Sequence, residues 1–321
     1  MEGKVKCLEI PTPFLVGPVN VYLVEGEALT LVDTGPKTDE ALHSMKEQLS
    51  SFGYLLSDIE QVVVTHHHPD HVGLVDVFSD KVPIIGHVKN RPWLTQDQGF
   101  RENMYDFFQK LYTEHGLENE LFTKIKQTQE MYMTYSCHSD VDIEVGQGDE
   151  VQGLAGWKVI ETPGHAQSHI SLHNETTGEL IAGDHLIAKI SSNAIIEAPY
   201  EAGEEREKTL IQYRDALKYC KELDVSKYYP GHGQVIVNGT ELIDERLQGN
   251  EERALTIQTI IGKEKTTCFD IVQKLFPKMY MKQPALTFSE VLGHLDLLEQ
   301  REKVEVEKVE GIIYYRNRLS E

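Results

Sequence analysis

The segment with the greatest capacity for chemistry is a run of histidines with one aspartate, placed directly after a short apolar stretch. It reads Thr65-His66-His67-His68-Pro69-Asp70-His71. Neutral imidazole and carboxylate groups are the ligands that zinc and similar first-row metals prefer. His66 and His68 stand two residues apart at the end of a predicted strand, so both can point the same way. Asp70 and His71 follow a turn-forming proline and can face an adjacent direction. The segment therefore predicts a metal site.

Three further candidate ligands, His165, Asp184 and His232, each follow a predicted strand. Their local sequences are Thr162-Pro163-Gly164-His165, Ala182-Gly183-Asp184 and Pro230-Gly231-His232-Gly233. Taken singly, a glycine followed by a histidine is more often a turn than a ligand. Their shared position raises their weight, because sites in α/β proteins collect at strand ends, where glycine lets the backbone approach closely.

The elements that must position these residues alternate as in layered α/β proteins. Helical spacing of apolar residues predicts helices near residues 42–49 and over residues 204–223. β-Branched and alternating stretches predict strands at residues 19–24, 29–32, 59–65, 82–86, 141–145, 157–161, 169–173, 180–181 and 228–229.

Two regions depart from this alternation. Residues 90–137 are aromatic and helical, which predicts a helical insertion packed on the core or forming a cap beside the site. From about residue 250 on, three apolar helical stripes precede a hairpin with strands at 304–308 and 312–316. Three helices followed by a hairpin are typical of a winged-helix domain.

Composition narrows the class of protein. The chain has 321 residues and a net charge of -21, which disfavours a nucleic-acid partner without excluding one. The tail from residue 250 on holds 12 acidic and 11 basic residues, so nearly all of the charge lies in residues 1–249. Four scattered cysteines, no signal-like N-terminus and no apolar run long enough to span a bilayer predict a cytoplasmic protein without a membrane partner.

The ordered motifs resemble those of the metallo-β-lactamase superfamily. The resemblance rests on His66-x-His68-x-Asp70-His71, His165, Asp184 and His232, with Asp33-Thr34-Gly35 similar to the first motif, and covers about residues 15–240. It implies an αββα sandwich, with a catalytic domain over 1–249, the helical insertion at about 90–137, and a small winged-helix-like α+β domain over 250–321.

The resemblance also implies a ligand set for two divalent metal ions, with zinc expected and manganese or iron as alternatives. By this analogy His66, His68 and His165 hold the first ion, and Asp70, His71 and His232 hold the second. Asp184 bridges the two ions, and Asp33 orders the loop beneath the histidines. Two such ions activate a shared water as the nucleophile, which Asp70 would orient as the catalytic residue.

Three activities compete on this basis. The first is hydrolysis of a small ester, thioester, lactone or related molecule; glyoxalase II shares the His-His-His-x-Asp-His run. The second is an endoribonuclease or phosphodiesterase of the winged-helix-bearing β-lactamase-like subgroup. The third is a mononuclear iron oxidoreductase of the persulfide dioxygenase type. The predicted helix at residues 289–300 has three acidic residues and no Lys or Arg. This favours a packing, homodimerisation or pocket-completing role for the tail over nucleic-acid binding.

The remaining histidines of the motifs are predicted to have structural roles. His67 lies between two candidate ligands and must point away from them, which predicts packing. His169 and His185 adjoin candidate ligands and are expected to support the site, with a hydrogen bond to substrate or to a ligand carboxylate as the alternative.

Overall fold

The computed structural model describes residues 4–201 and 203–318 and divides them into two compact units. Within the described residues, the first unit comprises 4–97, 131–192 and 216–243. The second comprises 98–130, 193–201, 203–215 and 244–318. The predicted domain boundary between residues 249 and 250 lies inside a continuous helix, α7, which spans Gly239–Ile261.

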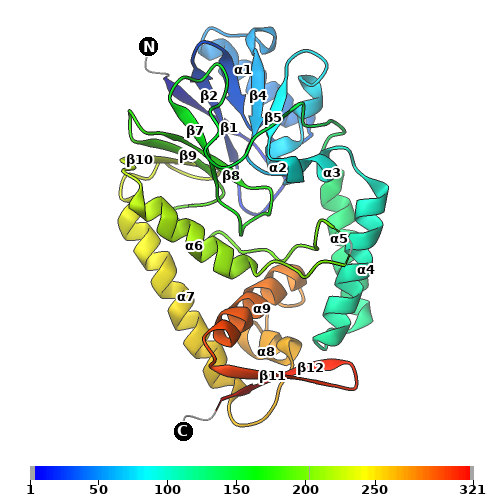
Figure 1. The fold of residues 1–321 in the computed structure, drawn as a ribbon. Coiled ribbons are helices and arrows are strands. Elements are labelled where there is room, and N and C mark those ends of the chain that lie inside the picture. The colour runs from blue at the N-terminus through cyan, green and yellow to red at the C-terminus, as the bar shows by residue number, and fades with distance from the viewer. Residues whose placement is uncertain (1–3, 202, 319–321) are drawn as a thin grey trace. The chain divides into compact units, whose positions relative to one another are not determined.

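A six-stranded sheet in the first unit carries the histidine run at the end of one of its central strands. Its spatial order follows the sequence, with β1 to β3 antiparallel and β3 to β6 parallel (Figure 1). The strands are β1 Val5–Ile10, β2 Val19–Glu25, β3 Leu29–Val32, β4 Gln61–Val64, β5 Ile84–Gly86 and β6 Ile143–Glu144.

A second sheet of four strands, in the order β10-β9-β8-β7, carries the other candidate ligands. Strand β10 runs parallel to β9, and the other two pairs are antiparallel. Its strands are β7 Trp157–Glu161, β8 Ile170–Asn174, β9 Glu179–Gly183 and β10 Lys227–Pro230.

Alternation along the strands builds two separate apolar cores. In β4, Val62 and Val64 pack in one core with residues of helix α1 (Asp39–Ser51), whereas Val63 packs in the other with residues of the second sheet. Successive side chains of a strand point to opposite faces, so this sheet is covered by a helix on one side and by a sheet on the other. The predicted α/β sandwich is confirmed.

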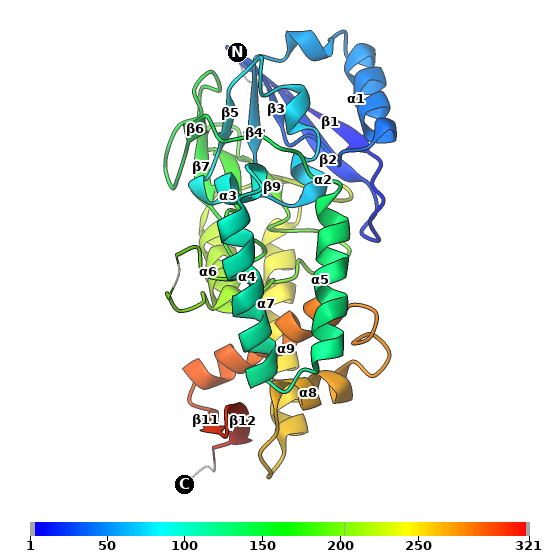
Figure 2. The same ribbon diagram turned by 90° about the vertical axis from the view of Figure 1, so that its right-hand side faces the viewer.

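Most predicted helices are present with small shifts of their ends. Helices α4 and α5 form the predicted insertion and lie side by side (Figure 2). Besides α1 and α7, the helices are α2 Pro69–Val72, α3 Arg91–Leu94, α4 Gln98–Glu114, α5 Asn119–Met133, α6 Thr209–Glu222, α8 Cys268–Leu275 and α9 Pro284–Gln300.

The C-terminal segment has the predicted order of elements. Helices α7, α8 and α9 are followed by an antiparallel hairpin of β11 (Val304–Val309) and β12 (Ile312–Asn317). The winged-helix classification stays a prediction. Two polar residues of α9, His294 and Asp296, are buried. The Asp296 carboxylate accepts hydrogen bonds from both terminal nitrogens of Arg206, at 2.6 and 2.7 Å.

Strand β1 was not anticipated from the sequence. It is an edge strand with exposed polar side chains among its residues, and only Leu8 and Ile10 are buried in the core. All four cysteines are free thiols. None of the helices in the described part of the chain has the length and hydropathy needed to cross a membrane.

Candidate metal centre

Local sequence explains how the histidine run turns toward one point. Strand β4 ends at Val64, and His68 is the N-cap of the short helix α2, whose first residue is Pro69. Proline suits the first helical position because its missing N–H would have no partner there. His66 and His68 therefore lie on an extended loop, whereas Asp70 and His71 lie on the first turn of a helix.

Ring nitrogens of three histidines lie close together and form the first group of candidate ligands. His68 Nδ1 lies 3.0 Å from His66 Nε2 and 3.0 Å from His165 Nε2. Burial, with the neighbouring histidines, lowers the pKa of His66 and His68 well below the ordinary value, so both rings are neutral and offer lone pairs. His165 follows β7, so this group joins loops from both sheets.

A second group lies beside the first. His232 Nε2 is 3.3 Å from Asp70 Oδ2, and candidate ligand atoms of Asp70, His71 and His232 lie within 4.8 Å of one another. Burial lowers the pKa of His71, but the carboxylates of Asp33, Asp184 and Asp70 raise it well above its ordinary value. The surroundings of this ring thus favour positive charge, which a bound cation would supply.

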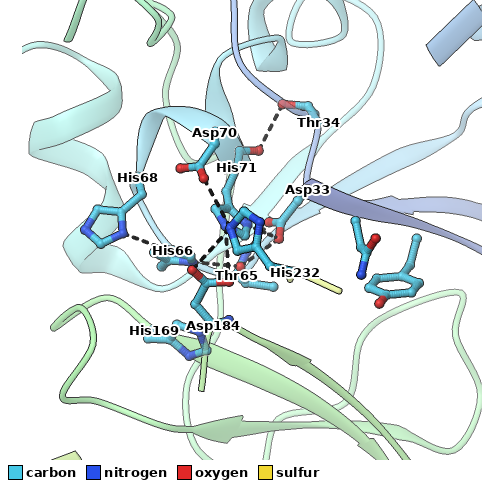
Figure 3. Close-up of polar contacts among 12 residues, drawn as sticks. Asp33, Thr34, Thr65, His66, His68, Asp70, His71, His169, Asp184 and His232 are labelled. Atoms are coloured by element: carbon cyan, nitrogen blue, oxygen red, sulfur yellow. Dashed lines mark hydrogen bonds and ion pairs between the residues drawn. The ribbon is translucent and has the colours of Figure 1, made fainter. Parts of the chain in front are cut away.

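Asp184 lies between the two groups (Figure 3). Its carboxylate oxygens are 3.5 Å from His71 Nε2, 3.5 Å from His165 Nε2 and 3.6 Å from His232 Nε2. Burial would raise the pKa of this carboxyl, but His232, His71 and His165 hold it well below the ordinary range. The structure therefore brings all seven predicted ligands together, with one carboxylate facing both groups.

Partners outside the centre fix the protonation of three of its rings. The Asp33 carboxylate accepts from the Thr65 amide and hydroxyl, both at 2.8 Å, and from His71 Nδ1 at 2.7 Å. Because the Thr65 hydroxyl proton is used in this way, His66 Nδ1–H must donate to Thr65 Oγ1, 3.0 Å away. His232 Nδ1 donates to the Pro18 carbonyl at 2.7 Å. In the neutral form of each ring, which is the form that binds a metal ion, Nε2 is then the unprotonated nitrogen that faces the centre.

The hydrogen bonding of the inward-facing atoms indicates whether these residues suit metal ions. His71 Nε2, His232 Nε2 and Asp184 Oδ1 are buried and have no hydrogen-bond partner within the protein. Buried polar atoms without partners cost free energy, and several lone pairs aimed at one place cannot satisfy each other. A cation satisfies all of them at once. The mixed nitrogen and carboxylate donors fit zinc and similar first-row metals.

His67 does turn away from the centre, as the sequence predicts. Its ring stacks on Trp93 with centroids 4.1 Å apart and planes 5° apart, and its Nδ1 is 2.9 Å from Ser168 Oγ. Burial lowers its pKa to about 3. His67 thus joins the loop after β4 to the loop that carries His165. His185 is completely buried, and burial lowers its pKa to about 3 as well.

Sequence reasoning did not single out several residues that support the centre. Thr65, Trp93 and Ser168 are the clearest examples. The direct adjacency of Thr65 to His66, and of Ser168 to His169, is the only signal that the sequence offers. Ser192 is also buried and donates its hydroxyl to the Asp184 carbonyl.

Gly231 leaves room for the carboxylate between the two groups, which gives a direct test of the geometry. A Cβ at this position would lie 2.1 Å from Asp184 Oδ1 and 2.9 Å from His71 Cε1. We expect Gly231→Ala to displace Asp184 and to lower kcat/KM about 100-fold, because displacements near 1 Å can cost that much. Metal content and kinetics on a reporter ester would measure this.

A matched glycine provides the control. Gly249 lies in α7, is exposed and has no heavy atom within 4 Å of an added Cβ. Gly249→Ala should leave kcat/KM unchanged and stabilise the helix by about 1 kcal/mol. Wild-type metal content and turnover in Gly231→Ala would show that Asp184 does not occupy the described position in the working protein.

Comparison with known proteins agrees with this geometry. Residues 15–232 match the metallo-beta-lactamase superfamily. A Bacillus subtilis protein named probable metallo-hydrolase YqjP is 44% identical over 298 residues, covering 93% of each chain. The solved structure of a metallo-beta-lactamase family protein from Thermus thermophilus has a TM-score of 0.81 and 25% identity, covering 98% of each chain.

A more distant relative is named for its activity. The atrochrysone carboxyl ACP thioesterase nsrC of Aspergillus novofumigatus is 25% identical over 76% of this chain and 58% of its own length.

Proposed function

Because this chain belongs to the metallo-β-lactamase superfamily and is a hydrolase of that fold, we propose that it hydrolyses a small ester or thioester with two divalent metal ions as cofactors. One observation carries the proposal. Two adjacent groups of donor residues, one of His66, His68 and His165 and one of Asp70, His71 and His232, share the carboxylate of Asp184 between them, and all but the half-buried His68 are buried. A single-metal site would not need the second group.

Bound metal ions supply an activated water nucleophile and stabilise the negative charge that develops on the substrate. The protein's own residues do the rest. The hydrogen bonds of Asp33 and Thr65 hold the rings of His66 and His71 with Nε2 facing inward, where both would serve as ligands. Asp70 Oδ2 lies at the inner edge of the second group, where it can orient water and accept its proton.

The choice of substrate class rests on charge and on one relative. The net charge of -21 lies almost entirely within residues 1–249, and such an acidic protein repels polyanions. The fungal relative is named a thioesterase. A small acyl ester or thioester is therefore favoured over RNA, with lactones as the nearest chemical alternative.

Metal analysis combined with a substrate screen tests the proposal. Protein purified without added metal should hold two equivalents of zinc, manganese or iron per chain. It should turn over p-nitrophenyl esters, acyl-coenzyme A thioesters or lactones faster than bis-p-nitrophenyl phosphate or single-stranded RNA. One equivalent of iron with oxygen uptake on a persulfide would refute hydrolysis, and preferred cleavage of RNA would refute the small-molecule substrate.

A further inference from the structure

A chain of hydrogen bonds behind Asp184 runs through three buried side chains. The Asp184 amide donates to His169 Nε2 at 3.0 Å, and His169 Nδ1 lies 2.7 Å from Thr162 Oγ1. Thr162 Oγ1 lies 3.0 Å from Ser171 Oγ, which donates to the Ala182 carbonyl at 3.3 Å. The chain thus begins and ends on two residues that flank Gly183 at the end of β9.

The direction of every bond in this chain can be assigned. A backbone N–H can only donate, so His169 Nε2 is an acceptor and the single proton of the neutral ring is on Nδ1. That proton is donated to Thr162 Oγ1. The Thr162 hydroxyl is then free to donate to Ser171, whose own proton goes to the carbonyl. All four bonds point the same way, and no donor or acceptor in the chain conflicts with its neighbour.

The backbone between Ala182 and Asp184, which the hydrogen-bond chain joins, has a left-handed conformation at Gly183. Gly183 has a φ of +49°, and a Cβ there would lie 2.8 Å from His169 Nε2. This left-handed residue turns the chain so that the amide of Asp184 faces His169 while its carboxylate faces the metal ligands. His169 is 1% exposed, and Thr162 and Ser171 are completely buried, so water does not compete for these bonds.

We propose that His169 is a positioning residue for Asp184. Thr162 selects the tautomer of His169 whose Nε2 accepts a hydrogen bond from the Asp184 amide. Neither ring nitrogen of His169 is left to bind metal or substrate, which excludes the alternative that the sequence left open. The inference depends on the proposed function only in that Asp184 is taken to be a ligand.

Two substitutions of His169 separate the bond to Asp184 from the bond to Thr162. His169→Gln can place its amide oxygen near the position of Nε2 and still accept from the Asp184 amide. His169→Asn can place its amide nitrogen near Nδ1 and keep only the bond to Thr162. We expect His169→Asn to weaken Zn²⁺ binding about 10–100-fold, the range for lost partners of metal ligands. His169→Gln should stay within about tenfold of wild type.

A second pair of variants tests the role of Thr162. Thr162→Ser keeps the hydroxyl and should keep Zn²⁺ affinity, whereas Thr162→Val has nearly the same shape but removes the acceptor for His169 Nδ1. Affinity is measured by competition with a chelator, and the absorption spectrum of the Co²⁺-loaded protein reports ligand geometry. If these residues only filled space, the Co²⁺ spectrum would be the same in the variants as in wild type. The two His169 variants would then lose Zn²⁺ affinity to the same extent.

The proton on His169 can be located without metal or turnover. ¹⁵N-labelled histidine NMR of the metal-free protein should show a protonated Nδ1 and an unprotonated Nε2 for His169. The opposite form, or wild-type Zn²⁺ affinity in His169→Asn, would overturn the inference. If wild-type protein itself bound no metal, the proposed function would fail instead, and the NMR result would still decide the hydrogen-bond chain.

Discussion

Asp184→Ala is expected to lose at least one of two metal equivalents and to lower kcat/KM about a thousandfold or more, while the fold persists. Asp184 is the residue whose carboxylate lies within 3.6 Å of ligands from both groups. Its loss should therefore exceed the ~10–100-fold cost of removing a partner that only orients a ligand. Removal of one preorganised group that stabilises charge costs about 10²–10³ on its own.

The fold should survive because the Asp184 carboxylate does little to hold it. Its Oδ1 is buried without a hydrogen-bond partner, and the bonds that fix this residue are made by its backbone. Metal-free Asp184→Ala should still fold cooperatively, but it should melt below metal-free wild type because it lacks the attraction to the histidines that lowers the pKa of this carboxyl. Added Zn²⁺ should raise the melting temperature of wild type more than that of Asp184→Ala, since a native-state ligand stabilises by mass action.

An exposed carboxylate serves as the control for charge removal. Asp80 is exposed and outside the centre, so Asp80→Ala should match wild type in metal content and kinetics. Full turnover in Asp184→Ala would contradict the shared-carboxylate arrangement. A metal-free variant that is also unfolded would instead show that Asp184 stabilises the protein.

The seven candidate ligands could be predicted from the sequence because their residue types are unusual and they follow the ends of strands. What could not be predicted are the contacts that orient them. The partner of His232 is the carbonyl of Pro18, more than 200 residues away, and a backbone carbonyl leaves no trace in side-chain pattern. The form of His169 is likewise set by Thr162 and by an amide, which only the fold brings together.

The fold likewise has elements that could be predicted from the sequence and elements that could not. Strand β4 is apolar on both faces over residues 62–64 and was predicted, because both faces are buried against other layers. Strand β1 has polar side chains exposed at the sheet edge, which weakens the alternation that identifies a strand. In α9, helical spacing alone would place Asp296 in solvent. Its burial depends on Arg206, which lies 90 residues earlier in the chain.

That arginine gives the second large expected effect. Asp296→Ala should lower the free energy of unfolding by about 3–5 kcal/mol, because Arg206 would keep a buried charge without its partner. The two side chains are 17% and 4% exposed and are joined by two hydrogen bonds. Urea denaturation at pH 7, compared with wild type, measures the loss.

Removing both charges should have the opposite consequence. Burial raises the pKa of the Asp296 carboxyl, and burial also opposes the charge of Arg206, whose pKa Asp296 nevertheless raises. Apolar residues of similar volume would remove the desolvation cost of both charges at once. We therefore expect Arg206→Met with Asp296→Leu to be neutral or about 1–4 kcal/mol more stable than wild type. If the double variant were as unstable as Asp296→Ala, the pair would be a net source of stability. In that case the arginine's hydrogen bonds, rather than the avoidance of an unpaired charge, would hold residues 203–215 to α9.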